Sequence, residues 1–199
     1  RGRIMARMPI DPRLSRMLIA ARSRGCLPPL LVVAAALSIQ DPRERPVDRE
    51  PAADQAHAVF KDPASDFVTL LNIWERTRDI VRTGPLKRFC REHFLSLRRI
   101  REWRDIHRQL ASIAAEAGLD QTRPPPPAAA HKRDETFGAL YTAIHTAILS
   151  GFLSNVALRK EKNFYRAARG RECMLFPGSG LFNRAGDWIV AAEMVHTSR

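Results

Sequence analysis

The sequence lacks the short motifs that bind nucleotides or metal ions. None of its ten glycines is followed by lysine, so the phosphate-binding loop Gly-x-x-x-x-Gly-Lys-[Ser/Thr] is absent. The patterns Gly-x-Gly-x-x-Gly, His-Glu-x-x-His and Gly-x-Ser-x-Gly are also missing. The six histidines are scattered without the spacing of metal ligands. We therefore expect no catalytic residue, no metal site and no bound cofactor in this sequence.

Cysteines and long apolar runs are also scarce. The three cysteines, Cys26, Cys90 and Cys173, form no Cys-x-x-Cys pair, and a sparse odd set is typical of a protein of the reducing cytoplasm. The apolar run LPPLLVVAAAL (27–37) is shorter than the roughly 20 residues of a membrane span. It predicts a buried helix, and we expect no membrane partner. Because no methionine precedes Arg1, we expect the sequence to be a piece of a longer protein.

Positive charge is abundant. Lys and Arg number 33 against 21 Asp and Glu, which gives a formal net charge of +12. Such a surplus favours a polyanionic partner, with nucleic acid first and an acidic membrane surface second. A basic but inert surface is the alternative. Because 45% of the residues are apolar, the chain can bury a core.

Apolar periodicity and stop signals predict a mainly α fold. Asp11-Pro12 starts the first helix and Gly25 ends it, and Ser65 caps another helix that we expect to end at Gly84-Pro85. From Leu86 to Ala117 the apolar stripe changes phase by roughly a third of a turn. This change predicts two helices that break near Ser96, or one bent helix. The further expected helices cover residues 29–39, 52–60 and 135–153.

The second half of the chain changes character twice. Residues 120–131 contain four consecutive prolines, Pro124 to Pro127, which favour a stiff extended linker over a ligand for a proline-binding domain. After Asn155, short apolar segments separated by glycine-containing turns predict a small antiparallel sheet. The expected strands cover residues 156–158, 163–167, 172–176 and 188–195. This length hardly allows a closed five-stranded barrel, so we expect an unpaired sheet edge.

Two groups of basic residues are candidate nucleic-acid contacts. Arg101, Arg104 and Arg108 share one helix face with Arg98 at its margin, where planar guanidinium groups could follow a phosphate backbone. The alternative is a solvated face with local ion pairs to Glu102 and Asp105.

The second group lies in the strand region. There the basic residues alternate with Phe164 and Tyr165, so the sheet could hold phosphates and stack bases, although either aromatic residue could equally belong to the core. The basic residues of this group are Arg159, Lys160, Lys162, Arg166, Arg169 and Arg171.

Several motifs together resemble the C-terminal helicase-associated region of bacterial DEAH-box ATP-dependent RNA helicases of the HrpA type. Their order and spacing are specific, and they cover most of the chain outside residues 119–135. The motifs are RMPIDPRLSRML (7–18), GC (25–26), ALSIQDPRERP (36–46), SDF (65–67), LLNIW (70–74), Cys90, Phe94, REWRDIHRQL (101–110), ILSGFLSNV (148–156), FPGSGLF (176–182) and WIVAAEMVHTS (188–198).

The resemblance implies a domain organisation and a function. Residues 1–10 would be the tail of a winged helix, residues 11–154 a ratchet-like helical bundle and residues 155–199 a partial OB-fold. Single-stranded RNA would pass between this region and the motor domains of the same parent chain, with the long helix of Arg101 facing the channel. ATP and Mg would bind to the motor domains, which this sequence lacks, so we expect the chain alone to be inactive as an ATPase.

Two other interpretations remain open. The chain could be a protein-interaction module that docks acidic or cofactor proteins, or an inert spacer. RNA binding that weakens steeply as the salt concentration rises would favour the helicase-associated region over both of these interpretations.

Overall fold

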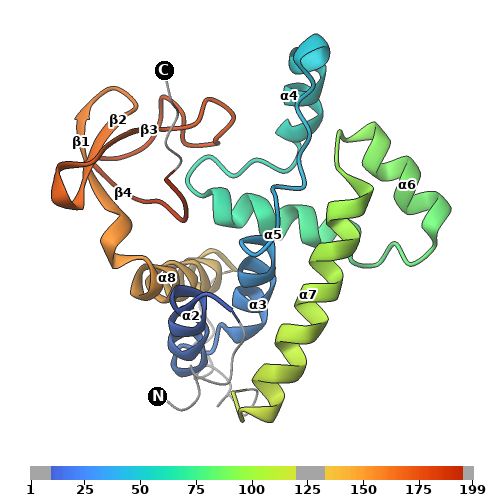
Figure 1. Cartoon of the computed structure of the whole chain (residues 1–199), viewed down its shortest axis with the longest axis horizontal. Helices are drawn as coiled ribbons and strands as arrows, with labels where there is room; N and C mark the ends of the chain where they lie inside the picture. Colours follow the sequence, from blue (N-terminus) through green and yellow to red (C-terminus); the bar gives the residue numbers. More distant parts are fainter. Residues whose placement is uncertain (1–9, 120–132, 195–199) are drawn as a thin grey trace.

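The computed structural model describes residues 10–119 and 133–194, which form a helical body with a small sheet at one side (Figure 1). The sheet follows the helices in the chain and connects to the end of helix α8. This arrangement agrees with the predicted class, a mainly α bundle followed by a small antiparallel β region. The helices are α2 (Pro12–Ser23), α3 (Leu27–Ala36), α4 (Glu50–Ala58), α5 (Asp66–Thr77), α6 (Thr83–Glu92), α7 (Leu97–Glu116) and α8 (Arg133–Gly151), with short 3-10 turns at Val47–Arg49, Leu153–Asn155 and Ala168–Gly170.

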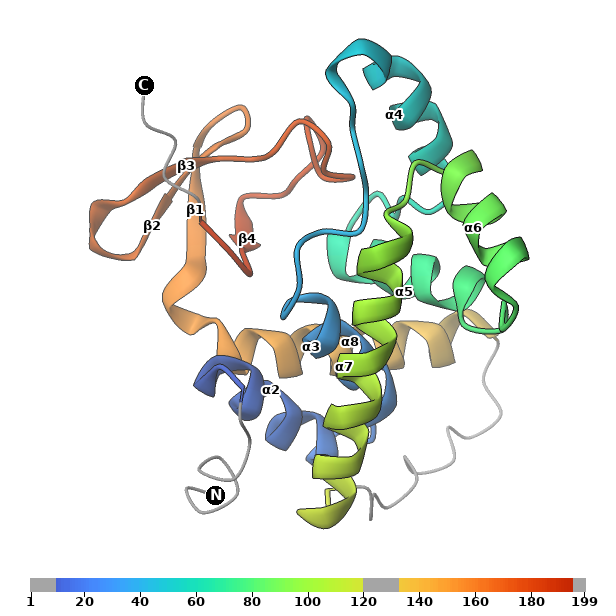
Figure 2. The ribbon, with the colours of Figure 1, turned by 45° about the vertical axis from the view of Figure 1, so that its right-hand side comes forward.

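Helix α3 forms the centre of the bundle. It contacts α2, α5, α7 and α8, and eight of its ten residues are buried (Figure 2). Such a helix needs apolar residues on every side, which the run LPPLLVVAAA supplies. Trp103 of α7 is fully buried against it and donates its indole N–H to the Val32 carbonyl at 2.9 Å. The prediction of a buried helix in this run is therefore confirmed.

Local capping explains where the first helices begin. The Asp11 carboxylate accepts a hydrogen bond from the Arg13 amide at 2.8 Å, and Pro12 occupies the first helical position. The Ser65 hydroxyl accepts one from the Val68 amide at 3.2 Å at the start of α5. Gly25 follows α2 with a φ of 66°, a conformation that glycine adopts readily. All three boundary signals are confirmed.

The predicted end of α5 is wrong. The helix ends at Thr77, and Gly84 and Pro85 lie in the first turn of α6. Proline is compatible with a first helical turn because the amides there have no partner inside the helix. The pair therefore marks a helix start, while the chain leaves α5 several residues earlier.

The change of phase after Leu86 corresponds to two separate helices. Helix α6 ends at Glu92 and α7 starts at Leu97, with Phe94 at a φ of 50° between them. The Leu95 backbone at this break pairs with Arg43 in an isolated β-bridge. The predicted break near Ser96 is thus confirmed, and the bent-helix alternative is wrong.

The sheet has four antiparallel strands in the order β3-β2-β1-β4. One side packs on a small second core that contains Ala157, Tyr165, Ala167 and Ala185. The other side of the sheet is exposed. The strands are β1 (Val156–Glu161), β2 (Phe164–Ala167), β3 (Glu172–Met174) and β4 (Trp188–Val190). All four lie at the predicted segments, but β1 extends three residues further than predicted, and β3 and β4 end earlier.

A loop between β3 and β4 fastens the sheet to the bundle. The Ser179 hydroxyl donates to the Asp66 carboxylate at the start of α5 at 2.5 Å, and the Gly180 amide donates to the same group at 3.0 Å. A Cβ on Gly180 would lie 2.2 Å from the Asp62 carbonyl oxygen, so only glycine fits there without a shift. This contact sets the position of the sheet relative to α5.

The expected winged-helix tail over residues 1–10 and the proline linker at 120–131 lie almost entirely outside the described residues. The proposed domain boundaries therefore stay predictions. Among the helices that the structure describes, none is long and apolar enough to cross a membrane.

Candidate nucleic-acid interface

Arg104 has a structural role that the sequence did not predict. Its guanidinium group donates to the Ile80 carbonyl at 3.2 Å and also to the Thr77 carbonyl, where α5 ends. Cationic donors at a helix C-terminus satisfy carbonyls that have no partner within the helix. Arg104 therefore attaches the end of α5 to α7, and its contribution to an RNA surface stays a prediction.

The other three arginines predicted on α7 are exposed. Arg101 reaches only the Thr83 hydroxyl at 3.4 Å, and no hydrogen bond or ion pair is found for Arg98 among the described residues. Arg108 pairs with Asp105 at 2.5 Å, as the alternative of a solvated face predicts, but both side chains are more than half exposed. Such a pair is weak, so a phosphate could compete for Arg108.

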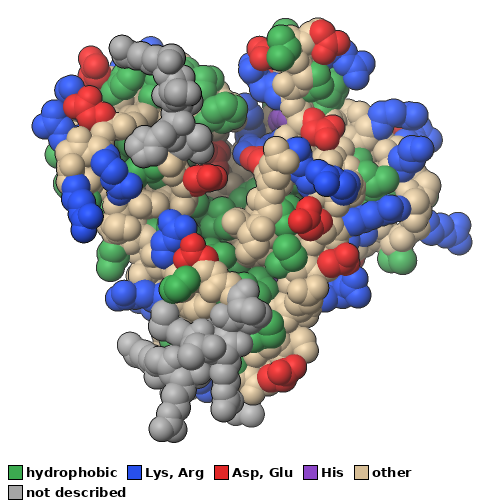
Figure 3. Space-filling view, viewed as in Figure 1, with side chains coloured by type: hydrophobic (Ala, Val, Ile, Leu, Met, Phe, Trp, Pro, Cys, Tyr) green, Lys and Arg blue, Asp and Glu red, His purple; other side chains and the backbone are tan. Residues whose placement is uncertain are grey.

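Helix α6 brings further basic residues to this surface, which the sequence analysis missed. Lys87 and Arg91 are exposed one turn apart on the polar side of α6, and the contact between Arg101 and Thr83 joins the two helices. The strong amphipathicity of residues 83–92 was the signal that could have identified them. We call the group Lys87, Arg91, Arg98 and Arg101 the α6–α7 basic surface; Figure 3 shows Lys and Arg gathered over these helices.

The basic residues of the strand region differ in their partners. Lys160 and Arg166 share one carboxylate oxygen of Glu172, at 2.9 and 3.2 Å, and Arg159 lies 3.7 Å from Asp187. The shared carboxylate lowers the phosphate-binding capacity of Lys160 and Arg166 but does not neutralise both.

The remaining three basic residues of this region lie in turns or at the edge of the sheet. Lys162 and Arg169 are exposed in the turns that flank β2, and no ion pair is found for either among the described residues. Arg171 donates to the Ser154 carbonyl at 3.1 Å. Lys162 and Arg169 are thus the strand-region cations most available to an anion.

The two aromatic residues of the strand region lie on opposite sides of the sheet. Tyr165 is 1% exposed and donates its hydroxyl to the Gly186 carbonyl at 2.9 Å, so it belongs to the sheet core. Phe164 is 43% exposed on the opposite side of the sheet. The sequence left both possibilities open for each residue, and the strand register decides between them.

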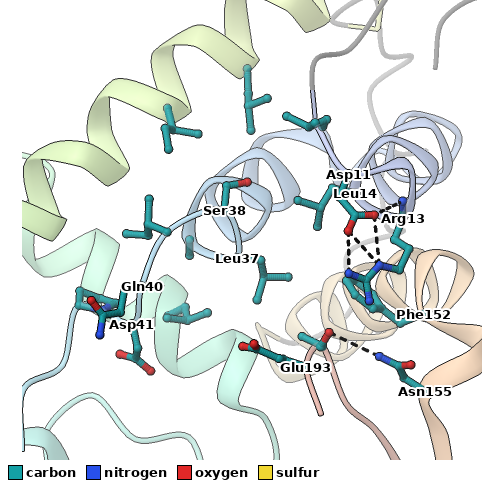
Figure 4. A pocket seen from close by; sticks show the side chains of 18 of the residues that line it. Asp11, Arg13, Leu14, Leu37, Ser38, Gln40, Asp41, Phe152, Asn155 and Glu193 are labelled. Carbon is teal, nitrogen blue, oxygen red and sulfur yellow. Dashed lines mark hydrogen bonds and ion pairs between the residues drawn. The ribbon is translucent and has the colours of Figure 1, made fainter. Parts of the chain in front are cut away.

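A cavity of about 1120 Å³ lies between the bundle and the C-terminal segment (Figure 4). Of the ten predicted contact residues, all of which the structure describes, only Arg171 lines it. Carboxylates from Asp11, Asp41 and Glu193 stand on its wall, and the Arg13 guanidinium lowers the pKa of Asp11. Arg13 pairs with Asp11 and Arg43 pairs with Asp41, so the cavity carries charges of both signs, and nine of the ten predicted contact residues lie outside it.

Histidines and cysteines offer little further chemistry in the described residues. No group of three or more His, Cys, Asp or Glu side chains there could hold a metal ion. Burial raises the pKa of the Cys26 and Cys90 thiols to about 11, which makes both unreactive. Burial also lowers the pKa of His57 and of His107.

Comparisons with known proteins agree with the arrangement of bundle and sheet. Residues 11–70 match the helicase associated domain (HA2), ratchet-like, and residues 144–199 match the oligonucleotide/oligosaccharide-binding (OB)-fold. The whole chain is 38% identical over 202 residues to the ATP-dependent RNA helicase HrpA of Escherichia coli (strain K12). It is 39% identical over 202 residues to the HrpA homolog of Haemophilus influenzae (strain ATCC 51907 / DSM 11121 / KW20 / Rd).

A eukaryotic relative is also similar over all of this chain. The chain is 30% identical over 203 residues to the pre-mRNA-splicing factor ATP-dependent RNA helicase prp22 of Schizosaccharomyces pombe (strain 972 / ATCC 24843). The chain spans only 14% of each HrpA relative and 16% of prp22, although each match covers all of this chain. The chain therefore belongs to the family of helicase-associated (HA2) and OB-fold regions that RNA helicases of the HrpA type contain.

Proposed function

We propose that the chain is an accessory region of an ATP-dependent RNA helicase and holds single-stranded RNA by contacts to its sugar–phosphate backbone. The observation that carries this proposal is the α6–α7 basic surface, whose four cations lie exposed on a chain that matches RNA helicases over its full length. Motor domains elsewhere in the longer protein supply ATP hydrolysis, with ATP and Mg bound there. The cytoplasm suits such a protein, because the three cysteines of the chain are free.

The physical basis is electrostatic. Exposed guanidinium and ammonium groups bind phosphate oxygens without reading the bases, and each neutralised phosphate releases counterions. The α6–α7 basic surface is held rigidly because Arg104 ties α5 to α7 and because Leu86 and Cys90 bury α6 against the bundle. The helices that carry these cations are therefore ordered before RNA binds, and the entropic cost of binding falls on the exposed side chains alone. The surface therefore suits a holding role that leaves movement to the motor.

Charge-matched variants test the proposal. Fluorescence anisotropy of a labelled single-stranded oligoribonucleotide measures the affinity of the chain, of a Lys87→Ala/Arg91→Ala variant and of an Arg16→Ala/Arg22→Ala control. The control removes the same charge from exposed positions on α2. We expect the α6 variant to bind more weakly and to show a smaller dependence of log K on log salt, by about 0.7 for each phosphate that the variant no longer binds. Equal losses of affinity in the two variants would contradict the proposal, because RNA binding would then depend on the net charge of the chain and not on the α6–α7 basic surface.

An ATPase assay tests whether ATP hydrolysis belongs to the motor domains and not to this chain. The chain has no phosphate-binding loop, so we expect no ATP hydrolysis with or without RNA. Measurable turnover that copurifies with the chain, and that persists in independent preparations, would contradict the assignment of hydrolysis to other domains.

A further inference from the structure

The break between α6 and α7 has a backbone conformation that a residue with a side chain rarely adopts. Phe94 lies in this break with a φ of 50°. At such a φ the Cβ of a residue other than glycine crowds the backbone, so the conformation persists only where the surrounding structure holds it. A strained residue between the two helices of the α6–α7 basic surface indicates that contacts from elsewhere in the chain fix their relative orientation.

The loop that follows α3 holds the backbone on both sides of Phe94. The Glu44 amide donates to the Phe94 carbonyl, and the Ser96 amide donates to the Pro42 carbonyl, each at 2.8 Å. These two hydrogen bonds form the isolated antiparallel bridge at the break. The loop therefore pairs with the break as a short strand would, and it supplies one of the contacts that hold Phe94 in place.

His57 of α4 is a second donor to the same carbonyl. Its Nε2 lies 3.1 Å from the Phe94 carbonyl oxygen, and the residue is 5% exposed. A carbonyl oxygen can only accept a hydrogen bond, so His57 carries a hydrogen on Nε2. Burial lowers the pKa of His57, so the ring is neutral at neutral pH. His57 thus connects α4 to a break that lies 37 residues later in the chain.

Aromatic contacts extend this support to α6. The Arg49 guanidinium lies 5.0 Å from the centroid of the Phe94 ring. Phe60, which follows α4 and is 1% exposed, has its ring centroid 6.3 Å from that of Phe89 and 5.4 Å from that of His93. The segment around α4 therefore contacts both the break and the end of α6, and Figure 2 shows α4 next to this end of α6.

We propose that His57 is a positioning residue for the α6–α7 basic surface: by holding the break at Phe94, it sets the orientation of the two cations on α6 relative to the two on α7. The proposal rests on the proposed function and deepens it, because it says what keeps the four cations in one arrangement. Phosphates repeat at regular intervals along a strand, so cations on two helices can bind neighbouring phosphates only in certain orientations of these helices. His57 is buried, so it acts through the backbone of Phe94 and not by touching RNA.

Hydrogen exchange on the unaltered chain gives the first test. The exchange rates of the Glu44, Leu95 and Ser96 amides are measured by NMR with and without a single-stranded oligoribonucleotide. If RNA binds best when the break is held, RNA must in turn stabilise the break, because coupling between two equilibria is reciprocal. We expect these amides to exchange more slowly in the complex, by about 5-fold or more. The Arg24 amide, which forms its hydrogen bond at the end of α2, is the control and should exchange at an unchanged rate.

Two replacements of His57 separate its hydrogen bond from its bulk. His57→Leu fills the buried site without a donor, whereas His57→Gln keeps an amide N–H that lies as many bonds from the backbone as Nε2 does. We expect His57→Leu to raise the exchange rates of the Leu95 and Ser96 amides about 2- to 10-fold, which corresponds to the loss of one hydrogen bond. The same variant should weaken RNA binding, and His57→Gln should restore most of both properties.

A double-mutant cycle assigns the loss of affinity to the cations of α6. Because His57 acts through the orientation of Lys87 and Arg91, His57→Leu should have no further effect on a chain that already carries Lys87→Ala/Arg91→Ala. His145→Leu is the matched control, since it removes another histidine that bonds between two helices, at 2.7 Å to the Ser65 hydroxyl, but away from the break. This control variant should bind RNA as tightly as the unaltered chain does.

The outcomes separate this proposal from the proposed function. If Lys87→Ala/Arg91→Ala weakens RNA binding and His57→Leu does not, or if the two losses add, the positioning role is overturned and the backbone-holding role stands. Unchanged exchange of the Leu95 and Ser96 amides in the RNA complex also overturns the positioning role, and this measurement needs no variant, so it holds even if His57→Leu does not fold. If Lys87→Ala/Arg91→Ala binds RNA as tightly as the unaltered chain, both proposals fail.

Discussion

Replacement of Arg104 by alanine separates a structural arginine from its exposed neighbours. The guanidinium group of Arg104 donates to the carbonyls of Thr77 and Ile80, and the Thr77 carbonyl also accepts the Ile80 amide at 3.0 Å. The variant therefore removes charged donors from both carbonyls, but only the Ile80 carbonyl loses all the partners found for it in the described residues. A hydrogen bond that involves a charged group contributes about 1.5–3 kcal/mol.

We expect Arg104→Ala to lower the free energy of unfolding by about 2–3 kcal/mol, because it removes the partly buried hydrogen bonds at the end of α5. For a chain of this size the same change corresponds to a fall in melting temperature of roughly 4–12 °C. Urea and thermal unfolding followed by circular dichroism measure both quantities.

Arg108→Ala is the matched control, since it removes an arginine one turn further along the same helix. The pair of Arg108 with Asp105 is exposed, with side-chain exposures of 77% and 57%, and such pairs contribute about 0.5 kcal/mol or less. If Arg104→Ala and Arg108→Ala unfold at the same midpoint, the structural role assigned to Arg104 is refuted.

Two further predictions concern packing and pH. Gly180→Ala should lower the free energy of unfolding by about 1–3 kcal/mol in urea, because its Cβ would lie 2.2 Å from the Asp62 carbonyl oxygen. Gly84→Ala is the control: a Cβ there has nothing within 4 Å, so this variant should be neutral or slightly stabilising. Equal stabilities of the two variants would contradict the close contact at Gly180. Burial lowers the pKa of His107 in the folded chain, so the unfolded state takes up the proton first as pH falls below about 6.5, and stability should decrease from neutral pH toward the lowered pKa. His107→Gln should show a smaller decrease over that pH range, and an unchanged pH profile would argue against the burial of a neutral imidazole.

The helix boundaries were predictable where they depend on local chemistry. Asp11 and Ser65 accept hydrogen bonds from amides two and three residues ahead, and Gly25 adopts a positive φ, so each signal acts within one turn of its own position. Gly84-Pro85 misled the prediction because a proline can both follow a helix and occupy the first turn of the next one. Only the packing of α6 on the bundle distinguishes these two cases.

The roles of the arginines were harder to predict from sequence. Arg104 and Arg108 have the same side chain and lie one turn apart, yet only Arg104 meets the carbonyls of a helix that ends more than twenty residues earlier in the chain. That contact depends on the place of α5 beside α7, which no local pattern reports. The same holds for Phe164 and Tyr165, since a shift of one residue in strand register would exchange the buried ring and the exposed ring.

The salt dependence of RNA binding tests the central claim most directly. The affinity of the chain for one single-stranded oligoribonucleotide is measured by fluorescence anisotropy over a series of salt concentrations. We predict a linear fall of log K with log salt, with a slope of about −0.7 for each phosphate held. An affinity that does not change with salt, or no binding at the lowest salt concentration, would contradict the claim that exposed cations on this chain hold an RNA backbone.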